Sequence, residues 1–203
     1  MTQPRGHYKK LLCLDTETSG LFYNNLNVCL DEKSGKYYQM VSIGMIVVDA
    51  STLEELDTLY VEIKWNGTSI WNDQAESVHK LSKDYLNKNG KTETDAVISI
   101  GNFLNNHFDV KRAIPLLGHN VGTFDRYFIT HLFERFGMGI FFGSRNIDTN
   151  SLGYAVFGTF NSDDLFTLVG IEKRTTHNAL EDARASLKVV QVVRDISKEL
   201  GLI

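Results

Sequence analysis

The sequence has little of what marks secreted, membrane-spanning or multidomain proteins. Among its 203 residues there are only two cysteines and two prolines. The spacing of Cys13 and Cys29 matches no zinc or redox motif, so nothing requires an oxidising compartment. No run of about 18 apolar residues occurs, and the polar, basic first ten residues are unlike a signal peptide. These absences predict a soluble, cytoplasmic protein without a membrane span.

A surplus of positive charge is missing too. The formal net charge is −4, and no dense run of lysine and arginine occurs. This argues against a protein that grips long nucleic acid over a broad surface. It leaves room for an enzyme that holds one strand end through metal ions, because bound cations supply positive charge locally.

The amino-acid composition is typical of a folded domain. Hydrophobic residues make up 42% and charged residues 23% of the sequence, which suffices to bury a core. No proline-rich linker divides the chain, so we expect a single domain over residues 1–203, with its core at about 10–197. The polar, asparagine-rich stretch 22–38 is expected to be a loop or hairpin inserted into this domain.

Hydrophobic spacing predicts the order of the secondary structure. Alternating and β-branched patterns indicate three strands in an antiparallel meander, at residues 10–15, 40–48 and 58–64. From residue 75 the spacing turns helical. Helices are expected at 75–89, from a cap at Thr94 or Asp95, at 124–136, 151–157, 164–169 and from Asn178 onward, with strands at 114–117 and 146–148. This order predicts an α/β fold in which helices flank a mixed sheet.

Two closely spaced carboxylates mark the end of the first predicted strand. Asp15 and Glu17 are two positions apart, which puts both side chains on one face of a strand. Like charges beside a buried strand repel each other and lose hydration, and a divalent cation would remove this conflict. A solvated turn with two surface acids is the alternative that this motif alone leaves open.

Two further sites place polar residues at helix starts. Asp125 follows a buried strand and a glycine-containing turn, and falls in the first turn of a predicted helix. His177 lies just before the last predicted helix, and Asp182 lies in its first turns. Taken singly, these residues are as typical of helix capping and of favourable dipole interactions as of a functional site.

Together the three sites indicate metal-dependent phosphoryl chemistry. Hard divalent cations such as Mg²⁺ and Mn²⁺ prefer carboxylate oxygens as ligands. A histidine, with its ordinary pKa of about 6.5, is suited to take a proton from water at neutral pH. Two metal ions about 4 Å apart can activate a water and stabilise the leaving oxygen of a phosphodiester. The set therefore predicts an acidic metal site with a histidine beside it.

In this order the motifs resemble the DEDDh branch of the DnaQ-like 3′–5′ exonuclease family. Three motifs carry the resemblance, at residues 14–21 (LDTETSGL), 119–125 (HNVGTFD) and 177–183 (HNALEDA). The third has the His-x4-Asp spacing, from His177 to Asp182, that marks this branch. Weaker likenesses lie at 77–79 and 147–149, where we expect His79 to be a packed helix residue and Asp148 a capping residue.

The resemblance implies a fold, a reaction and roles for particular residues. The fold would be ribonuclease-H-like, with a five-stranded mixed sheet. Two Mg²⁺ or Mn²⁺ ions would be held by Asp15, Glu17, Asp125 and Asp182. His177 would deprotonate the attacking water, and a nucleoside 5′-monophosphate would leave from a 3′ end. The residues expected to bind the substrate are Thr16, Thr18, Leu21, His119 and Asn120, of which Thr18 and Leu21 would line the pocket of the terminal nucleotide.

The sequence departs from the family pattern in two places. Five residues rather than four separate His119 from Asp125, and we expect Gly122 to absorb the extra one. The insertion at 22–38 is longer than in compact relatives and could influence substrate choice. The chain also stops soon after its last predicted helix, so we expect a stand-alone enzyme without a polymerase-binding tail.

The motifs leave the substrate and the alternatives to catalysis open. We favour single-stranded DNA, but the motifs do not read the 2′-hydroxyl, so an RNA-trimming enzyme of the oligoribonuclease or ribonuclease T type is the nearest alternative. A non-catalytic nucleic-acid-binding module on the same fold is the second, and an endonuclease of the ribonuclease H type is the third. Dimers are common among small related enzymes, so a homodimer is a further possibility.

Overall fold

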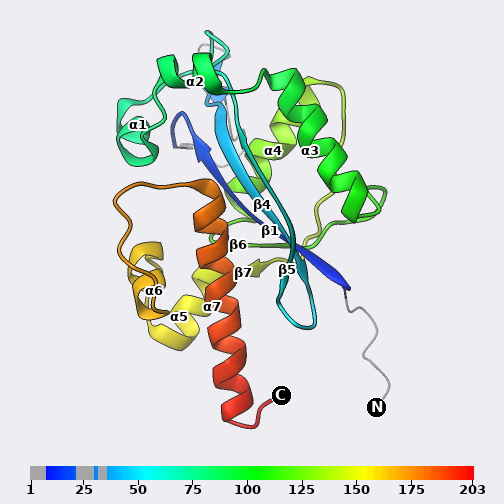
Figure 1. Cartoon of the computed structure of the whole chain (residues 1–203), viewed down its shortest axis with the longest axis vertical. Coiled ribbons are helices and arrows are strands. Elements are labelled where there is room, and N and C mark those ends of the chain that lie inside the picture. Colours follow the sequence, from blue (N-terminus) through cyan, green and yellow to red (C-terminus); the bar gives the residue numbers. More distant parts are fainter. Residues whose placement is uncertain (1–7, 22–29, 32–35) are drawn as a thin grey trace.

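A five-stranded mixed sheet forms the centre of the molecule. The structure, a computed structural model, describes residues 8–21, 30–31 and 36–203. The strand order is β5-β4-β1-β6-β7 (Figure 1). The strands are β1 (Lys10–Thr18), β4 (Met40–Asp49), β5 (Glu55–Glu62), β6 (Leu116–Gly118) and β7 (Ile147–Asp148). The first three pair antiparallel, whereas β6 runs parallel to β1 and to β7, which confirms the predicted meander and mixed sheet.

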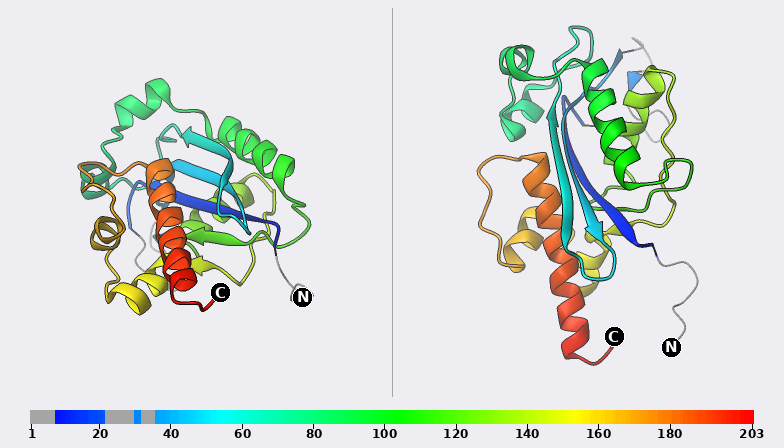
Figure 2. Two further views of the ribbon diagram at one scale, coloured as in Figure 1. Left: turned by 60° about the horizontal axis from the view of Figure 1, so that its bottom comes forward. Right: turned by 45° about the vertical axis from the view of Figure 1, so that its right-hand side comes forward.

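Helices cover both faces of this sheet. The described helices are α1 (Asp73–His79), α2 (Lys83–Asn89), α3 (Glu93–His107), α4 (Asp125–Arg135), α5 (Thr149–Phe157), α6 (Ser162–Leu168) and α7 (Ala179–Glu199). The long helix α7 lies on one face with α5 and α6 beside it, while α3 and α4 lie on the other (Figure 1, Figure 2). None of the described helices is long and apolar enough to cross a membrane.

The two faces have separate apolar cores because β1 alternates between them. Leu12 and Leu14 belong to the core that includes residues of α3 and α4. Leu11 and Cys13 point the other way and pack against α7. Cys13 is fully buried, and its thiol donates a hydrogen bond to the backbone oxygen of Ala183 at 3.1 Å. Asp15 and Glu17 continue the alternation of Cys13 and therefore face α7.

The insertion at 22–38 is described only in part. β2 (Leu30–Asp31) and β3 (Lys36–Tyr37) pair antiparallel as a separate two-stranded sheet, which agrees with the hairpin alternative. Tyr38 then forms a bridge with Ile70, so the end of the insertion is tied to the segment that leads into α1. The rest of the insertion, with Cys29, lies outside the described residues.

The first strand is longer than its apolar residues predicted. It continues to Thr18 instead of ending near Asp15, because β4 pairs with it as far as Met40. The two carboxylates therefore lie inside a strand, and a shift of register follows only after Glu17. A turn with two solvated acids was the alternative for this motif, and the structure excludes it.

Three other boundaries also differ from the prediction. The expected helix at 75–89 is two helices, because Lys80 between them adopts a left-handed conformation with φ of 61°. The cap of α3 is Thr92 rather than Thr94 or Asp95, since the Thr92 hydroxyl accepts the backbone N–H of Asp95 at 3.1 Å. The third strand is shifted, spanning 55–62 instead of 58–64.

A glycine in β4 lets α7 approach the sheet beside the carboxylates. Gly44 is the partner of Asp15 in the neighbouring strand. A Cβ atom at Gly44 would lie 2.3 Å from backbone atoms of Leu180, in the first turn of α7. Only glycine leaves space for this approach. The start of α7 therefore rests on the sheet at the level of Asp15.

Candidate active site

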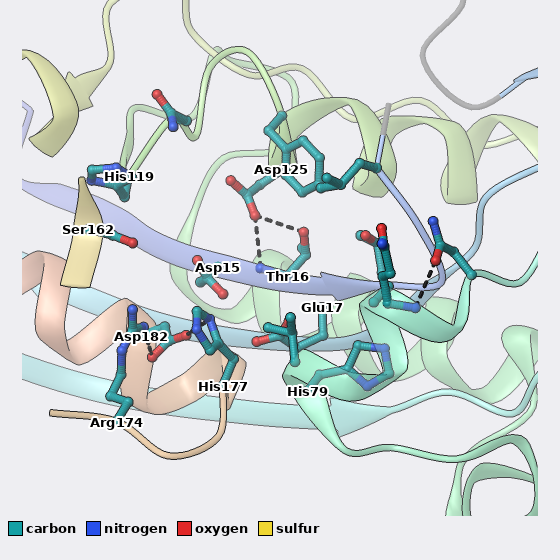
Figure 3. A pocket seen from close by; sticks show the side chains of 18 of the residues that line it. Asp15, Thr16, Glu17, His79, His119, Asp125, Ser162, Arg174, His177 and Asp182 are labelled. Atoms are coloured by element: carbon teal, nitrogen blue, oxygen red, sulfur yellow. Dashed lines mark hydrogen bonds and ion pairs between the residues drawn. The ribbon is translucent and has the colours of Figure 1, made fainter. Parts of the chain in front are cut away.

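A pocket of about 790 Å³ lies over the second half of β1. Figure 3 shows side chains from β1, α1, α4 and α7 converging on it. All ten residues predicted for the site line this pocket: Asp15, Thr16, Glu17, Thr18, Leu21, His119, Asn120, Asp125, His177 and Asp182. The three sequence motifs therefore meet in one place, while the roles of the individual residues stay predictions.

The carboxylates of β1 are in an unfavourable environment for negative charge. Glu17 is only 8% exposed, and its Oε1 atom is buried without a hydrogen-bond partner among the described residues. Burial, with Asp182 nearby, raises the pKa of Glu17 to about 8. Burial also raises the pKa of Asp15 well above its usual value, helped by the charges of Asp125 and Glu17. Such a cluster is stabilised by protons or by a cation.

The start of α7 contributes the third carboxylate and the histidine. Asn178 caps the helix by accepting the backbone N–H groups of Leu180 and Glu181 at 3.1 and 3.2 Å. His177 therefore lies just outside the first turn, where its Nδ1 is 3.3 Å from Oδ2 of Asp182. The contact with Asp182 raises the pKa of His177. Glu181, the residue before Asp182, is exposed and does not line the pocket.

These groups fit a divalent cation. Within the described parts of the chain, donor atoms of Glu17, His177 and Asp182 all lie within 4.8 Å of one another. Oε1 of Glu17 has no hydrogen-bond partner among the described residues, and the pKa of Glu17 is raised. Both features are expected of a buried carboxylate whose charge is balanced by a bound cation and not by a side chain of the protein. Asp15 lines the same pocket but does not belong to this closest group. Oxygen-rich donor sets of this kind suit Mg²⁺ and Mn²⁺.

Asp125 approaches the same pocket along the free edge of β1. Strand β6 pairs with β1 at Leu12 and Cys13, and among the described residues no strand lies beside the later part of this edge. Oδ1 of Asp125, at the start of α4, instead accepts the backbone N–H of Thr16 at 2.8 Å and its hydroxyl at 2.7 Å. Burial raises the pKa of Asp125 to about 7, although the hydrogen bonds from Thr16 act in the opposite direction.

The turn before α4 contains a residue in the left-handed conformation. The left-handed residue is Asn120, with φ of 58°, and not Gly122. Asparagine tolerates this conformation better than most residues, and the Asn120 N–H donates to Oδ1 of Asp148 at 3.0 Å. Asp148 also accepts from Asn150 and so caps α5, as predicted. A Cβ at Gly122 would lie 2.4 Å from the side-chain amide nitrogen of Asn146, so that a larger residue there would displace this side chain.

Two histidines form parts of the pocket wall. Nδ1 of His119 lies 3.1 Å from the hydroxyl of Thr149, and burial lowers the pKa of His119. His79 is packed in α1 as predicted, with Nδ1 accepting the backbone N–H of Leu81 at 3.0 Å. Burial lowers the pKa of His79 to about 4. Both rings are therefore neutral at physiological pH and shape the pocket without adding charge.

Several pocket residues were not predicted from the sequence. They are Asn72, Gln74, Ala75, Val78, Thr123, Phe124, Ser162, Phe166 and Arg174. Val78 lies within the weaker family likeness at 77–79, and its carbonyl accepts the N–H of His177 at 3.2 Å. Arg174 gave no signal, because an arginine in a polar loop is ordinary. Gly44 was missed as well, since a glycine within a strand does not reveal which backbone lies against it.

The fold and the acidic pocket are those of a ribonuclease-H-like nuclease. The chain belongs to the exonuclease family of the RNase T type, which matches residues 12–190. The match contains every predicted catalytic residue and confirms the resemblance to DEDDh exonucleases. The chain is also 30% identical to an oligoribonuclease from Shewanella amazonensis over 125 residues, which are 62% of this chain and 64% of that protein. The chain thus matches less than two thirds of the length of this relative.

Solved structures with the same fold include two exonucleases. Exonuclease I of E. coli, in complex with a dT13 oligonucleotide, superimposes with a TM-score of 0.74 at 16% identity, over 95% of this chain and 42% of that one. The nuclease domain of 3′hExo, a DEDDh family member bound to rAMP, has a TM-score of 0.65 at 12% identity, over 94% of each chain. At such low identities these likenesses establish the fold alone.

Proposed function

We propose that the protein is a metal-dependent 3′–5′ exonuclease that acts on single-stranded nucleic acid. The observation that carries the proposal is the convergence of Asp15, Glu17, Asp125 and Asp182 on one pocket, with His177 beside them. Buried acids with raised pKa values, in a family of exonucleases, are best explained by a need for divalent cations.

In this proposal the four carboxylates hold two Mg²⁺ or Mn²⁺ ions. Bound there, the ions would lower the pKa of a water and stabilise the leaving oxygen of the phosphodiester. His177 has its Nδ1 toward Asp182, so its Nε2 is left to take the proton of the attacking water. The water oxygen forms a bond to phosphorus while the bond to the 3′-oxygen of the preceding nucleotide breaks. A nucleoside 5′-monophosphate and a shortened strand with a 3′-hydroxyl result.

The apolar rim of the pocket suits a terminal base. Leu21 is 61% exposed and Val78 is 44% exposed, and both line the pocket although burial would favour such side chains. Apolar and aromatic surfaces bind bases without regard to sequence, since every base has a flat face. We assign Leu21 and Thr18 to the terminal nucleotide, and His119 and Asn120 to further contacts with the substrate in the same pocket. The volume of the pocket is in the range of small-ligand sites, which suits one strand end rather than a duplex.

DNA and RNA are the two candidate substrates, and they differ in the sugar. DNA is the substrate that we favoured from the sequence. The 30% identity to a protein named oligoribonuclease favours RNA as the second candidate. Because discrimination depends on contacts with the 2′-hydroxyl, matched single-stranded oligomers of DNA and RNA, compared at equal concentration, decide between them.

The experiment that tests the proposal is digestion of oligomers labelled at either end, in Mg²⁺, with the Asp15→Ala variant alongside. We expect immediate release of a labelled mononucleotide from the 3′ label, a descending ladder from the 5′ label, and no product with Asp15→Ala. Cleavage of a circular single strand would indicate an endonuclease instead. No cleavage of DNA or RNA, together with binding of the oligomer, would indicate a non-catalytic module.

A further inference from the structure

Arg174 lies against one of the carboxylates proposed to bind metal. It belongs to the loop between α6 and α7 and lines the pocket. Its Nη1 is 2.5 Å from Oδ1 of Asp182, and its Nη2 pairs with Asp163. The guanidinium lies over the ring of Phe166, 4.7 Å from the ring centroid. Figure 3 shows this arginine next to Asp182, on the side away from Asp125.

The surroundings keep Arg174 at the pocket independently of Asp182. Its side chain is only 12% exposed, with Asp163 at one end of the guanidinium and Phe166 beneath its plane. Its Nε is buried and has no hydrogen-bond partner in the described part of the chain. A side chain placed only for stability would be expected to use such a donor. The arginine is therefore anchored from outside the acidic group and directed toward it.

A divalent ion and Arg174 would compete for the carboxylate oxygens of Asp182. Its carboxylate is buried, and each oxygen now faces a basic side chain, Oδ1 toward Arg174 and Oδ2 toward His177. An ion bound by Asp182 would need at least one of these oxygens. It would also bring two more positive charges close to the guanidinium, and like charges repel strongly where solvent is excluded.

We propose that Arg174 is a positioning residue that orients Asp182 in the metal-free site and competes with the first metal ion for its carboxylate. The inference rests on the proposed function, since it takes Asp182 as a metal ligand. Arg174 thereby compensates part of the acidic charge before the ion arrives and weakens the binding of that ion. Arg174 then lowers the affinity of the site for its metal ion, so that occupancy of the site depends on the surrounding metal concentration.

Arg135 provides the matched comparison. It pairs with Glu93 and lies over the ring of Tyr37, with its guanidinium carbon 4.4 Å from the centroid. The contacts are of the same kind as those of Arg174, but Arg135 does not line the acidic pocket. Removing either arginine should destabilise the fold, whereas only the removal of Arg174 should alter the affinity for metal.

The test is a titration with Mn²⁺ alone, in which electron paramagnetic resonance reports the free ion and melting temperature reports the folded protein. For Arg174→Gln we expect half-saturation at a Mn²⁺ concentration about tenfold lower than for the unmodified protein, from the lost repulsion. Arg174→Lys keeps the charge but not the planar fork, so its half-saturation should fall in between. Arg135→Gln should bind Mn²⁺ like the unmodified protein.

The outcomes separate this inference from the proposed function. If the unmodified protein binds Mn²⁺ and Arg174→Gln binds it equally or less tightly, competition by Arg174 is wrong while the metal site stands. If Arg174→Gln does not fold, Arg174→Lys decides, and an unchanged half-saturation would overturn the inference. If the unmodified protein binds no Mn²⁺, the metal site itself is wrong, and the proposed function fails with it.

Discussion

Asp125 and Glu17 are carboxylates of the same pocket with opposite surroundings. Both are nearly buried, at 2% and 8% exposure, and both have raised pKa values, of about 7 and about 8. Asp125 accepts two hydrogen bonds from Thr16. Glu17 has an oxygen without any partner among the described residues. The protein thus supplies donors to one carboxylate and leaves the other to a partner from outside.

The difference follows from what lies on each side of β1. At its free edge the backbone N–H of Thr16 needs an acceptor, and Asp125 provides it, so this carboxylate also has a structural task. On the face toward α7 the neighbours of Glu17 are Asp182 and His177, and the acids repel each other. We therefore expect the α7 side of the pocket to respond most strongly to metal, and the Asp125 side to respond most strongly to the loss of Thr16.

The largest effect is expected for Glu17→Gln. Electrostatic stabilisation by a bound metal is worth several kcal/mol, so the rate should fall by about 10⁴-fold or more. The metal-free protein should become more stable, with a free energy of unfolding on the order of 2–3 kcal/mol higher at neutral pH, because a buried acid with a pKa near 8 is replaced by a neutral amide. Glu181→Gln, on the exposed face of α7, is the control and should change neither quantity.

A smaller loss of rate is expected for His177→Ala. Without the proton acceptor the rate should fall by about 10²–10⁴-fold, while binding of Mn²⁺ changes little. A complete loss of Mn²⁺ binding would show that His177 is a ligand, which its place within 4.8 Å of the Glu17 and Asp182 oxygens also permits. Rate measurements at several Mn²⁺ concentrations separate these two roles.

Gly44→Ala should move α7, which carries Asp182, away from the carboxylates of β1. The added methyl group would collide with the backbone of Leu180, which shifts α7 away from β1. We expect a loss of about 1–3 kcal/mol in the free energy of unfolding, as for other overpacked sites, together with weaker Mn²⁺ binding. Gly101→Ala in α3 has ordinary space around it and serves as the control for denaturant melts. Unchanged stability of Gly44→Ala would mean that the contact with α7 is looser than described.

The smallest effect is expected for Thr16→Val. It removes one of the two hydrogen bonds to Asp125 and should raise the pKa of this carboxyl further above its ordinary value. The rate at neutral pH should fall by roughly tenfold, in line with a lost hydrogen bond to a charged group. Part of the activity should return at higher pH. Thr16→Ser keeps the hydroxyl and should behave like the unmodified protein.

The sequence predicted which residues come together in the pocket better than it predicted the details of the fold around them. Asp15, Glu17, Asp125, His177 and Asp182 could be named because their spacing relates them to elements whose order was readable. The length of β1 could not be predicted, because β1 ends where its pairing with β4 ends and not where its own apolar run ends. The break at Lys80 inside an apparently continuous helical pattern was equally invisible.

The features that the sequence did not predict depend on contacts between segments far apart in the chain. The role of Gly44 rests on the backbone of Leu180, far along the chain. The place of Arg174 is fixed by Asp163, Phe166 and Asp182 together. The left-handed conformation of Asn120 was not predicted, and it is accompanied by a hydrogen bond from the Asn120 N–H to Asp148. Such arrangements follow from packing, for which a single sequence has no pattern.

The most direct test of the acidic pocket is the melting temperature between pH 5 and pH 9, with and without Mn²⁺. Folded Glu17 keeps its proton up to about pH 8, but the unfolded chain releases it above its ordinary pKa of 4.5. Raising the pH across this window therefore favours unfolding of the metal-free protein. Mn²⁺ should remove this decline, because it binds the deprotonated acids, and Glu17→Gln should show a smaller decline without metal, since Asp15 and Asp125, whose pKa values are also raised, still contribute. A flat profile that Mn²⁺ does not change would contradict the account.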